Sequence, residues 1–286
     1  MAVAAWMGAA LPASWTTRLG TWLGRAAYRV SRKHRRRAIS NLAMCFPEWD
    51  ESKVRNVARR VFEHFGKTLL LFFRAGKMKP EEVLASVDAG GVDHLDAALA
   101  RGKGVILISA HFGNWERMSH YLSVKGYAVS VVVRDANDAR LTRLVNRVRR
   151  LEGVDLFVRG SAAREILRRL NRNEVVGILP DQNTWEIYVP FFGFPAGTVS
   201  GPAVFHLRTG APILSCFCMQ TDGGRYRLEV RPLKTPDLSG DRDEDIKRIM
   251  TAVNEALEQM IRQSPEQWLW MHDRWKAARR KGLLDA

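Results

Sequence analysis

From residue 104 onward the chain alternates short apolar runs with longer amphipathic stretches, and this alternation constrains the fold most. The first run, Val105-Ile106-Leu107-Ile108, has no polar position, which is typical of a strand covered on both faces. Strands are expected at 105–108, 128–133, 156–158, 175–179, 213–219 and 226–231. Helices are expected from about 115 and at 138–151, 162–170 and 203–208. The pattern predicts a single-domain α/β fold with a mostly parallel, mixed central sheet flanked by helices.

Two longer helices are expected outside this alternation. The first covers 50–76, where an acidic start, a glycine stop and a 3.6-residue apolar period agree. The second covers about 243–262. Active-site residues of such a fold are expected just beyond the carboxyl ends of the parallel strands.

Positive charge is concentrated at the amino terminus. The 286 residues carry 45 Lys and Arg against 30 Asp and Glu, a net charge of +15. Residues 1–47 contain no acidic side chain and eight Lys or Arg residues. Five of these lie within 32–37, and the other three are Arg18, Arg25 and Arg29. Such a segment favours a polyanionic partner, either nucleic acid or an anionic membrane. We therefore divide the chain into a basic amino-terminal segment, 1–47, and a globular part, 48–286.

The segment around residues 15–32 has the pattern of an interfacial membrane helix. One helical face carries Trp15, Leu19, Trp22, Leu23, Ala26 and Val30, and another carries Arg18, Arg25, Arg29 and Arg32. This distribution suits the headgroup boundary of a bilayer, although a helix docked on the protein core with a solvated basic face is an alternative. The preceding apolar stretch, 1–17, is at the short limit for a spanning helix, so a single anchor and a peripheral helix both stay open. No nucleic-acid-binding motif accompanies the basic residues, so no nucleic acid partner is expected.

Several common chemistries lack support in the sequence. The three cysteines, Cys45, Cys216 and Cys218, form no C-x-x-C pair, and we expect buried, reduced thiols. The histidines show no metal-ligand spacing, so no metal is expected. Neither a nucleotide-binding phosphate loop nor a nucleophile elbow is present.

The candidate catalytic residues follow the strand at 105–108. His111 and Glu116 have H-x4-E spacing at a strand-to-helix junction, and Gly113 between them permits close approach of a substrate. A carboxylate that holds the imidazole by one nitrogen fixes its tautomer and stabilises the imidazolium. The pair is thus a candidate general base for a hydroxyl nucleophile. A structural histidine at a helix amino terminus is the alternative.

Several separate motifs, in this order, resemble those of the bacterial late lipid A acyltransferases, within the wider H-x4-D/E glycerolipid acyltransferase superfamily. They are RRR at 35–37, NLAMCFPE at 41–48, HFGNWE at 111–116, PDQ at 180–182, VPFFG at 189–193 with GPA at 201–203, and PEQWLWMH at 265–272. The resemblance extends from about residue 19 to 276.

The resemblance implies that His111 and Glu116 form a catalytic dyad and that 48–286 is the acyltransferase domain. It also implies a functional role for an arginine in the basic helix expected at 138–151 and for an aspartate after the strand expected at 175–179. We place the arginine at Arg149, with Arg147 as its competitor, and the aspartate at Asp181. Asp181 is expected to orient Arg149 or a substrate hydroxyl. Supporting or substrate-binding positions are also expected at Gly113 and Asn114.

The resemblance further implies a reaction without a resident cofactor. The acyl donor would be an acyl-carrier-protein or CoA thioester, and the acceptor a hydroxyl of a lipid A precursor. A lysophospholipid, a glycolipid or a phosphatidylinositol mannoside is the alternative acceptor. Acyl carrier protein and anionic inner-membrane lipid are the expected partners, and the cytoplasmic face of the bacterial inner membrane the expected location. Phe191, Phe192 and Phe194 are candidates for lining an acyl groove, and the oxyanion donor would be a backbone N–H near Gly113 or an arginine.

Overall fold

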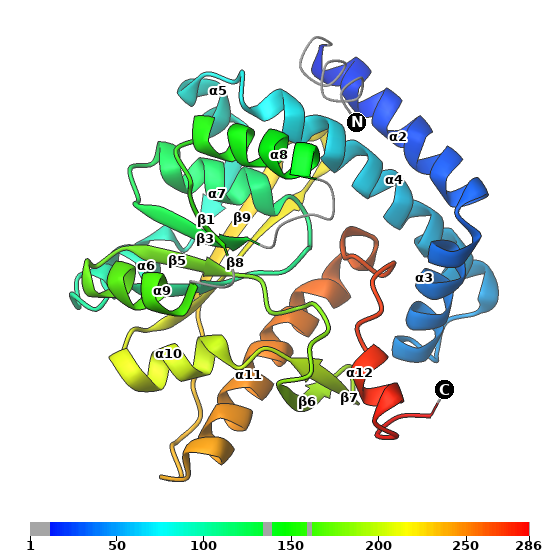
Figure 1. The fold of residues 1–286 in the computed structure, drawn as a ribbon. Coiled ribbons are helices and arrows are strands. Elements are labelled where there is room, and N and C mark those ends of the chain that lie inside the picture. Colours follow the sequence, from blue (N-terminus) through cyan, green and yellow to red (C-terminus); the bar gives the residue numbers. More distant parts are fainter. Residues whose placement is uncertain (1–11, 134–138, 159–161, 286) are drawn as a thin grey trace.

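A seven-stranded mixed sheet lies at the centre of the computed structural model, which describes residues 12–133, 139–158 and 162–285 (Figure 1). The strands are β1 (Val87–Gly90), β2 (Val105–Ile108), β3 (Val129–Val133), β4 (Asp155–Val158), β5 (Val175–Ile178), β8 (Ile213–Gln220) and β9 (Tyr226–Pro232). Their order in the sheet is β1-β9-β8-β2-β5-β3-β4. All neighbours are parallel except β8 and β9. The expected mostly parallel α/β sheet is confirmed.

Helices cover both faces of the sheet because successive side chains of a strand point to opposite sides. On one face, Val105 and Leu107 pack in a core with α5 (Pro80–Ala85), α6 (Val92–Leu99) and α7 (Trp115–Val124). On the other face, Ile106 and Ile108 pack with helices that come later in the chain. These are α9 (Ala162–Asn171), α10 (Gly201–Thr209) and α11 (Arg242–Gln263). The wholly apolar strand β2 therefore has the two-sided burial that its sequence predicts.

The helices at the amino terminus pack beside this sandwich. They are α2 (Ala13–Val30), α3 (Arg32–Cys45) and α4 (Glu51–Ala75). Helix α4 has nearly the expected bounds, and the Asp50 side chain caps it by accepting from the Lys53 N–H at 2.7 Å. Helix α8 (Ala139–Leu151) contacts α4, where Val148 packs on Phe72 and Phe73.

Helix α2 lies alongside α4 (Figure 1), and glycines let the two backbones approach closely. A Cβ atom added to Gly24 would lie 2.2 Å from the Phe62 carbonyl oxygen, and one added to Gly66 would lie 2.2 Å from the Gly20 carbonyl oxygen. The face of α2 that packs on α4 thus carries small residues, and the tryptophans of α2 point away from the protein. Trp15 and Trp22 are 60% and 63% exposed.

The structure corrects the expected layout of the amino-terminal helix. The helix ends at Val30, so Arg32 belongs to α3. Helix α2 is docked on the protein and also exposes tryptophan together with Arg18 and Arg29. Within the described ranges, no helix combines the length and the apolarity that crossing a bilayer requires. Residues 1–11 of the apolar stretch lie outside the described residues.

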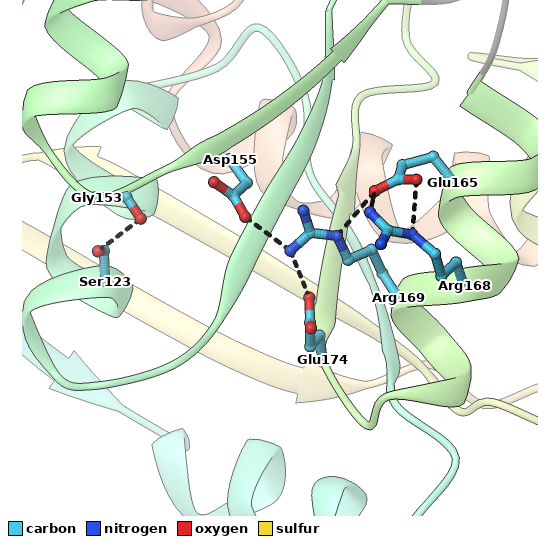
Figure 2. Close-up of polar contacts among 7 residues, drawn as sticks. All are labelled: Ser123, Gly153, Asp155, Glu165, Arg168, Arg169 and Glu174. Carbon is cyan, nitrogen blue, oxygen red and sulfur yellow. Dashed lines mark hydrogen bonds and ion pairs between the residues drawn. The ribbon is translucent and has the colours of Figure 1, made fainter.

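Charged side chains secure the β3–β4 edge of the sheet (Figure 2). Arg169 of α9 donates to Asp155 of β4 at 2.7 Å and to Glu174, just before β5, at 2.8 Å. Hydrogen bonds from Arg168 and Arg169 also lower the pKa of Glu165 to about 2. Nearby, the Ser123 hydroxyl donates to the Gly153 carbonyl at 3.2 Å, which joins the end of α7 to the turn before β4.

The carboxyl-terminal segment builds an aromatic core against a hairpin that the sequence pattern does not reveal. The hairpin consists of β6 (Ile187–Phe191) and β7 (Phe194–Thr198), and α12 (Lys276–Arg280) follows near the end of the chain. Trp268, Trp270 and Trp275 are fully buried; Trp268 and Trp275 pack on Phe191, and Trp270 packs on Phe192. The expectation that Phe191 and Phe192 line an acyl groove is therefore wrong, because both are buried in the hydrophobic core, whereas Phe194 is partly buried against it.

Buried polar and thiol groups complete the picture of the core. Arg274, near the carboxyl terminus, is fully buried and donates to the carbonyl of Gly197 and the hydroxyl of Thr198. The three cysteines are free and buried, as expected. Cys216 and Cys218 share one face of β8 in the same apolar cluster.

Candidate active site

The carboxyl ends of β2 and β5 bring two of the candidate residues together. The strands are parallel neighbours with Ile108 opposite Ile178, so the chain leaves both strands at the same edge of the sheet. His111 and Asp181 each follow three residues later. The His111 Nδ1 donates to Asp181 Oδ1 at 2.8 Å, and the His111 backbone N–H donates to Asp181 Oδ2 at 2.8 Å.

Asp181 is buried and its hydrogen bonds are saturated on the protein side. It is 2% exposed, and Oδ2 also accepts from the indole N–H of Trp268 at 2.9 Å. Burial alone would raise the pKa of this carboxyl, but the His111 imidazole and these hydrogen bonds hold it below its usual value. Asp181 is thus an ionised acceptor that orients His111. The ionisable side-chain partner of Asp181 in the structure is thus the imidazole of His111 and not Arg149.

His111 has the properties of a general base. Burial lowers the pKa of the imidazole, but the charge and hydrogen bond of Asp181 outweigh burial, and the pKa is raised above 6.5. Because Nδ1–H faces a carboxylate, the neutral ring presents the lone pair of Nε2. The His111 side chain is 23% exposed. The side-chain amide of Gln182 lies 3.3 Å from Nε2.

The prediction that the Glu116 carboxylate holds the imidazole of His111 is wrong. Glu116 lies in the first turn of α7, where it faces α8 and accepts from Arg149 Nε at 2.9 Å and from Arg149 Nη2. The indole N–H of Trp115 donates to Glu116 Oε1 at 2.9 Å. Glu116 acts on His111 only through space, where its charge raises the pKa of the imidazole. The carboxylate that holds the His111 ring therefore comes from Asp181, just after β5, and not from the first turn of α7.

The structure separates the two candidate arginines of the basic helix. The Arg149 side chain is 18% exposed and forms the two-pronged contact with Glu116. Burial lowers the pKa of its guanidinium, but the charge of Glu116 more than compensates, and the net change is upward. Arg147 is exposed. Of the two candidates, Arg149 is therefore the one that contacts Glu116.

Gly113 and Asn114 shape the loop after His111. Gly113 has φ +60°, and a Cβ atom there would lie 2.1 Å from the Cys218 carbonyl oxygen. Its N–H donates to the Gln267 carbonyl at 3.0 Å, and its carbonyl accepts from His64 Nε2 at 2.9 Å. Asn114 caps α7 by accepting from the Arg117 N–H at 2.9 Å.

These contacts change the expected roles of both residues. Gly113 is required by a close backbone approach, and the polar atoms of Asn114 are used within the protein, since its amide also donates to the Tyr226 hydroxyl at 3.2 Å. The N–H of Gly113, a candidate oxyanion donor, is already engaged. In the structure both residues make contacts that hold the loop after His111 in place.

An apolar groove of about 590 Å³ opens between α2, α4 and residues 269–272. Its lining includes Leu23, Ala27, Phe62, Phe65, Leu69 and Met271. The groove adjoins the site on two sides. The Trp115 ring lies 6.1 Å from that of Phe65 and 5.2 Å from that of His111, and His272, which lines the groove, accepts from the Asn183 N–H at 3.0 Å.

Sequence reasoning missed several residues around His111. Gln182 is adjacent to Asp181 in the PDQ motif, and that adjacency is the signal that could have identified it. His64 and His272 come from distant segments, and nothing in the sequence connects them with His111. Among the described residues, no group of histidine, cysteine and acidic side chains could hold a metal ion.

Comparison with known proteins identifies the family of this chain. The family of bacterial lipid A biosynthesis acyltransferases matches residues 1–277. A lipid A biosynthesis lauroyltransferase of Escherichia coli is 25% identical over 95% of this chain and 88% of its own length. A lipid A biosynthesis acyltransferase of Haemophilus influenzae is 24% identical over 90% and 79%. A phosphatidylinositol mannoside acyltransferase of Mycobacterium tuberculosis is 28% identical over 75% and 69%. Since the family match covers nearly the whole chain, this protein belongs to the bacterial lipid A biosynthesis acyltransferases and is an enzyme of the acyltransferase class.

Proposed function

We propose that this enzyme transfers a fatty acyl chain from an acyl-carrier-protein or CoA thioester to a hydroxyl of a lipid A precursor, with His111 as general base. The observation that carries the proposal is the Asp181–His111 contact at the end of two parallel strands, which leaves Nε2 as a proton acceptor. Nε2 removes the hydroxyl proton while that oxygen attacks the thioester carbonyl carbon. The C–S bond then breaks, and the imidazolium returns the proton to the leaving thiolate.

The transfer is direct and passes through no acyl-enzyme. Among the described residues near His111, the hydroxyl of Ser109 is a conceivable nucleophile, but that residue is 1% exposed and its Oγ is buried. The cysteine thiols are equally inaccessible, and burial raises the pKa of Cys218 to about 12. The acceptor hydroxyl therefore supplies the nucleophile.

Glu116 and Arg149 have separate roles in this proposal. Asp181 holds the imidazole, so Glu116 contributes negative charge that stabilises the imidazolium and fixes the guanidinium of Arg149 in position. Arg149 then presents its remaining N–H groups to an anionic part of a substrate, a phosphate or a carboxylate. Removal of either partner would leave the other charge largely buried without compensation.

The apolar groove would take an acyl chain. It adjoins His111 through Trp115 and is lined by side chains with no charge along most of its length. Each methylene group buried there contributes about 0.8 kcal/mol, so the length of the groove would discriminate between chains of different length.

We further propose that residues 1–47 are a membrane-associating segment and that 48–286 form the acyltransferase domain. The exposed tryptophans of α2 suit the headgroup boundary of a bilayer. Beside them, Arg29, Arg32, Lys33 and Arg36 are exposed and have no acidic partner within the described part of the chain. Anionic lipid at the cytoplasmic face of the bacterial inner membrane would neutralise them, at about 1 kcal/mol per charge. Acidic acyl carrier protein would dock on basic surface that the membrane leaves free.

A second acceptor is supported by one comparison. The relative from Mycobacterium tuberculosis is named for a phosphatidylinositol mannoside, and it covers three quarters of this chain. The same base and groove would act on a hydroxyl of that lipid, of another glycolipid or of a lysophospholipid.

Mass spectrometry of reaction products tests the proposal. Purified wild-type protein, His111→Ala and the surface control His94→Ala are each incubated with mixed acyl-carrier-protein or CoA thioesters and a tetra-acylated lipid A precursor. Parallel reactions contain a phosphatidylinositol mannoside or a lysophospholipid. One added acyl mass on the lipid A precursor, with wild type and His94→Ala only, supports the proposal. Acyl transfer only to one of the other lipids would mean that this lipid, and not a lipid A precursor, is the acceptor. Full activity of His111→Ala would show that His111 is not the general base.

A further inference from the structure

We propose that the side-chain amide of Gln182 is a further catalytic group of this site. In the structure it covers the lone pair of His111 Nε2, and during transfer it donates to the oxyanion that forms on the thioester carbonyl. The inference rests on the proposed general-base function of His111. Its starting point is the contact between Gln182 Nε2 and His111 Nε2 at 3.3 Å.

The direction of this hydrogen bond follows from the opposite side of the ring. His111 Nδ1 lies 2.8 Å from Oδ1 of Asp181, and the other carboxylate oxygen, Oδ2, accepts from two further N–H groups. Nδ1 must therefore carry the proton, and Nε2 of the neutral imidazole is an acceptor. The amide of Gln182 can meet this lone pair only with its N–H group. Gln182 thus holds a donor at the position where the acceptor hydroxyl must deliver its proton.

Several other N–H donors near His111 are engaged within the protein. The His111 N–H donates to Asp181, the Gly113 N–H to Gln267 and the Asn114 N–H to Cys218. Arg149 uses Nε and Nη2 on Glu116, and the indole of Trp115 donates to the same carboxylate. Gln182 is different because its partner is the catalytic nitrogen itself, and the substrate hydroxyl replaces that contact.

The backbone around Gln182 is fixed, so the amide is presented at a defined place. Asp181 is held by three hydrogen bonds, and Gln182 O accepts from buried Arg274 at 3.4 Å. The Asn183 N–H donates to His272, and Asn183 Oδ1 accepts from the Ala277 N–H at 2.8 Å. The Gln182 side chain itself is half-buried. A donor preorganised in this way stabilises developing charge without reorganising the loop.

Substrate binding would convert the cover into an oxyanion donor. A distance of 3.3 Å is long for a hydrogen bond, so the contact is weak and an incoming hydroxyl displaces it readily. When the hydroxyl oxygen attacks, its proton moves to Nε2 and the carbonyl oxygen becomes negative. The displaced amide, adjacent to both atoms, donates its N–H to that oxygen. Collapse of the tetrahedral intermediate breaks the C–S bond and returns the proton from His111 to the thiolate, and the amide is unchanged.

Steady-state and single-turnover kinetics of Gln182→Ala and Gln182→Glu test this role, with exposed Gln263→Ala as the matched control. Gln182→Glu keeps the shape of the side chain and replaces the N–H donor by an oxygen. We expect kcat to fall about 100-fold or more in both Gln182 variants with a small change in KM, because the donor acts in the transition state. The acid limb of the kcat/KM profile should move to higher pH in both, since a donor to neutral imidazole is lost. The control should match wild type.

Three results would overturn the inference. Wild-type kcat in Gln182→Ala would mean that another donor binds the oxyanion, and a raised KM with unchanged kcat would make Gln182 a binding residue only. Equal activity of Gln182→Glu and wild type would show that an N–H is not needed. His111→Ala, run beside them, separates this inference from the proposed function: inactive His111→Ala with active Gln182→Ala removes the role of Gln182 alone, whereas activity in both removes the general base as well. Should Gln182→Ala fail to fold, the isosteric Gln182→Glu alone decides between these outcomes.

Discussion

The Asp181→Asn substitution removes one charge from the site while it keeps the size of the side chain. Asp181 Oδ2 accepts from two N–H groups, the His111 backbone and the Trp268 indole, and Oδ1 accepts from His111 Nδ1. An asparagine has a single oxygen, and the two fixed N–H donors claim it. The asparagine NH₂ group must then face Nδ1, which can accept only if the imidazole proton moves to Nε2. The variant would hold His111 in the tautomer that cannot take a proton from a hydroxyl.

The expected loss in kcat is about 10⁴-fold, the size of effect that a wrong histidine tautomer causes in a hydrolase triad. This corresponds to roughly 5 kcal/mol of transition-state stabilisation. The assay measures thiol release from the acyl thioester as a function of pH. In wild type, activity should fall with decreasing pH as His111 becomes protonated, at a pKa above 6.5 because Asp181 favours the imidazolium. In Asp181→Asn the residual activity should titrate at a lower pH.

Asp237→Asn, an exposed carboxylate far along the chain, is the matched control and should behave as wild type. Circular dichroism and thermal unfolding show whether both variants are folded. The ionised Asp181 also stabilises the fold above its unfolded pKa near 3.9, and that contribution disappears as pH falls through its lower folded pKa. A kcat for folded Asp181→Asn within tenfold of wild type would refute the tautomer argument.

Three further predictions follow from the contacts described above. Arg149→Ala should lose about 100-fold in kcat/KM because Glu116 is released, whereas Arg147→Ala should retain wild-type kinetics; similar losses in both would contradict the assignment. Gly24→Leu should lower Tm by on the order of 5 °C in calorimetry, since its Cβ would lie 2.2 Å from a carbonyl oxygen of α4, and an unchanged Tm would show that α2 packs differently. A Trp15→Ser/Trp22→Ser double variant should bind anionic phosphatidylglycerol vesicles about tenfold or more weakly in a flotation assay with unchanged Tm; undiminished binding would remove α2 from the membrane contact.

Four ionisable residues of the site have other hydrogen-bond partners in the structure than the sequence led us to expect. The spacing pointed to His111 and Glu116, the family resemblance added Arg149 and Asp181, and the structure brings the four close together. It pairs them differently, with Asp181 on His111 and Arg149 on Glu116. Spacing within a motif places residues at one strand end or one helical turn, but the neighbouring strand or helix decides which opposite charge is nearest.

The aromatic residues show the same limit. Phe191 lies in a glycine- and proline-rich stretch, and its surroundings in sequence do not distinguish a ligand groove from a core. The carboxyl-terminal tryptophans close over the β6–β7 hairpin and bury it, and the groove forms between α2 and α4 instead. Short elements such as β1 and α6 were missed because a few residues carry too little periodicity to separate a strand or helix from a loop.

Local patterns in the sequence determined the class of the fold and the edge of the sheet where the site lies. Apolar runs require burial, helical periodicity requires a covered face, and parallel strands place their carboxyl ends together, so these features follow from short-range chemistry alone. The tertiary structure decided which carboxylate holds His111, that Gln182 faces its reactive nitrogen, and that glycines dock α2 with its tryptophans outward. Those contacts join residues 70 or more positions apart in the first two cases, and about 40 in the third, and only the packing of whole elements brings them within hydrogen-bond or van der Waals distance.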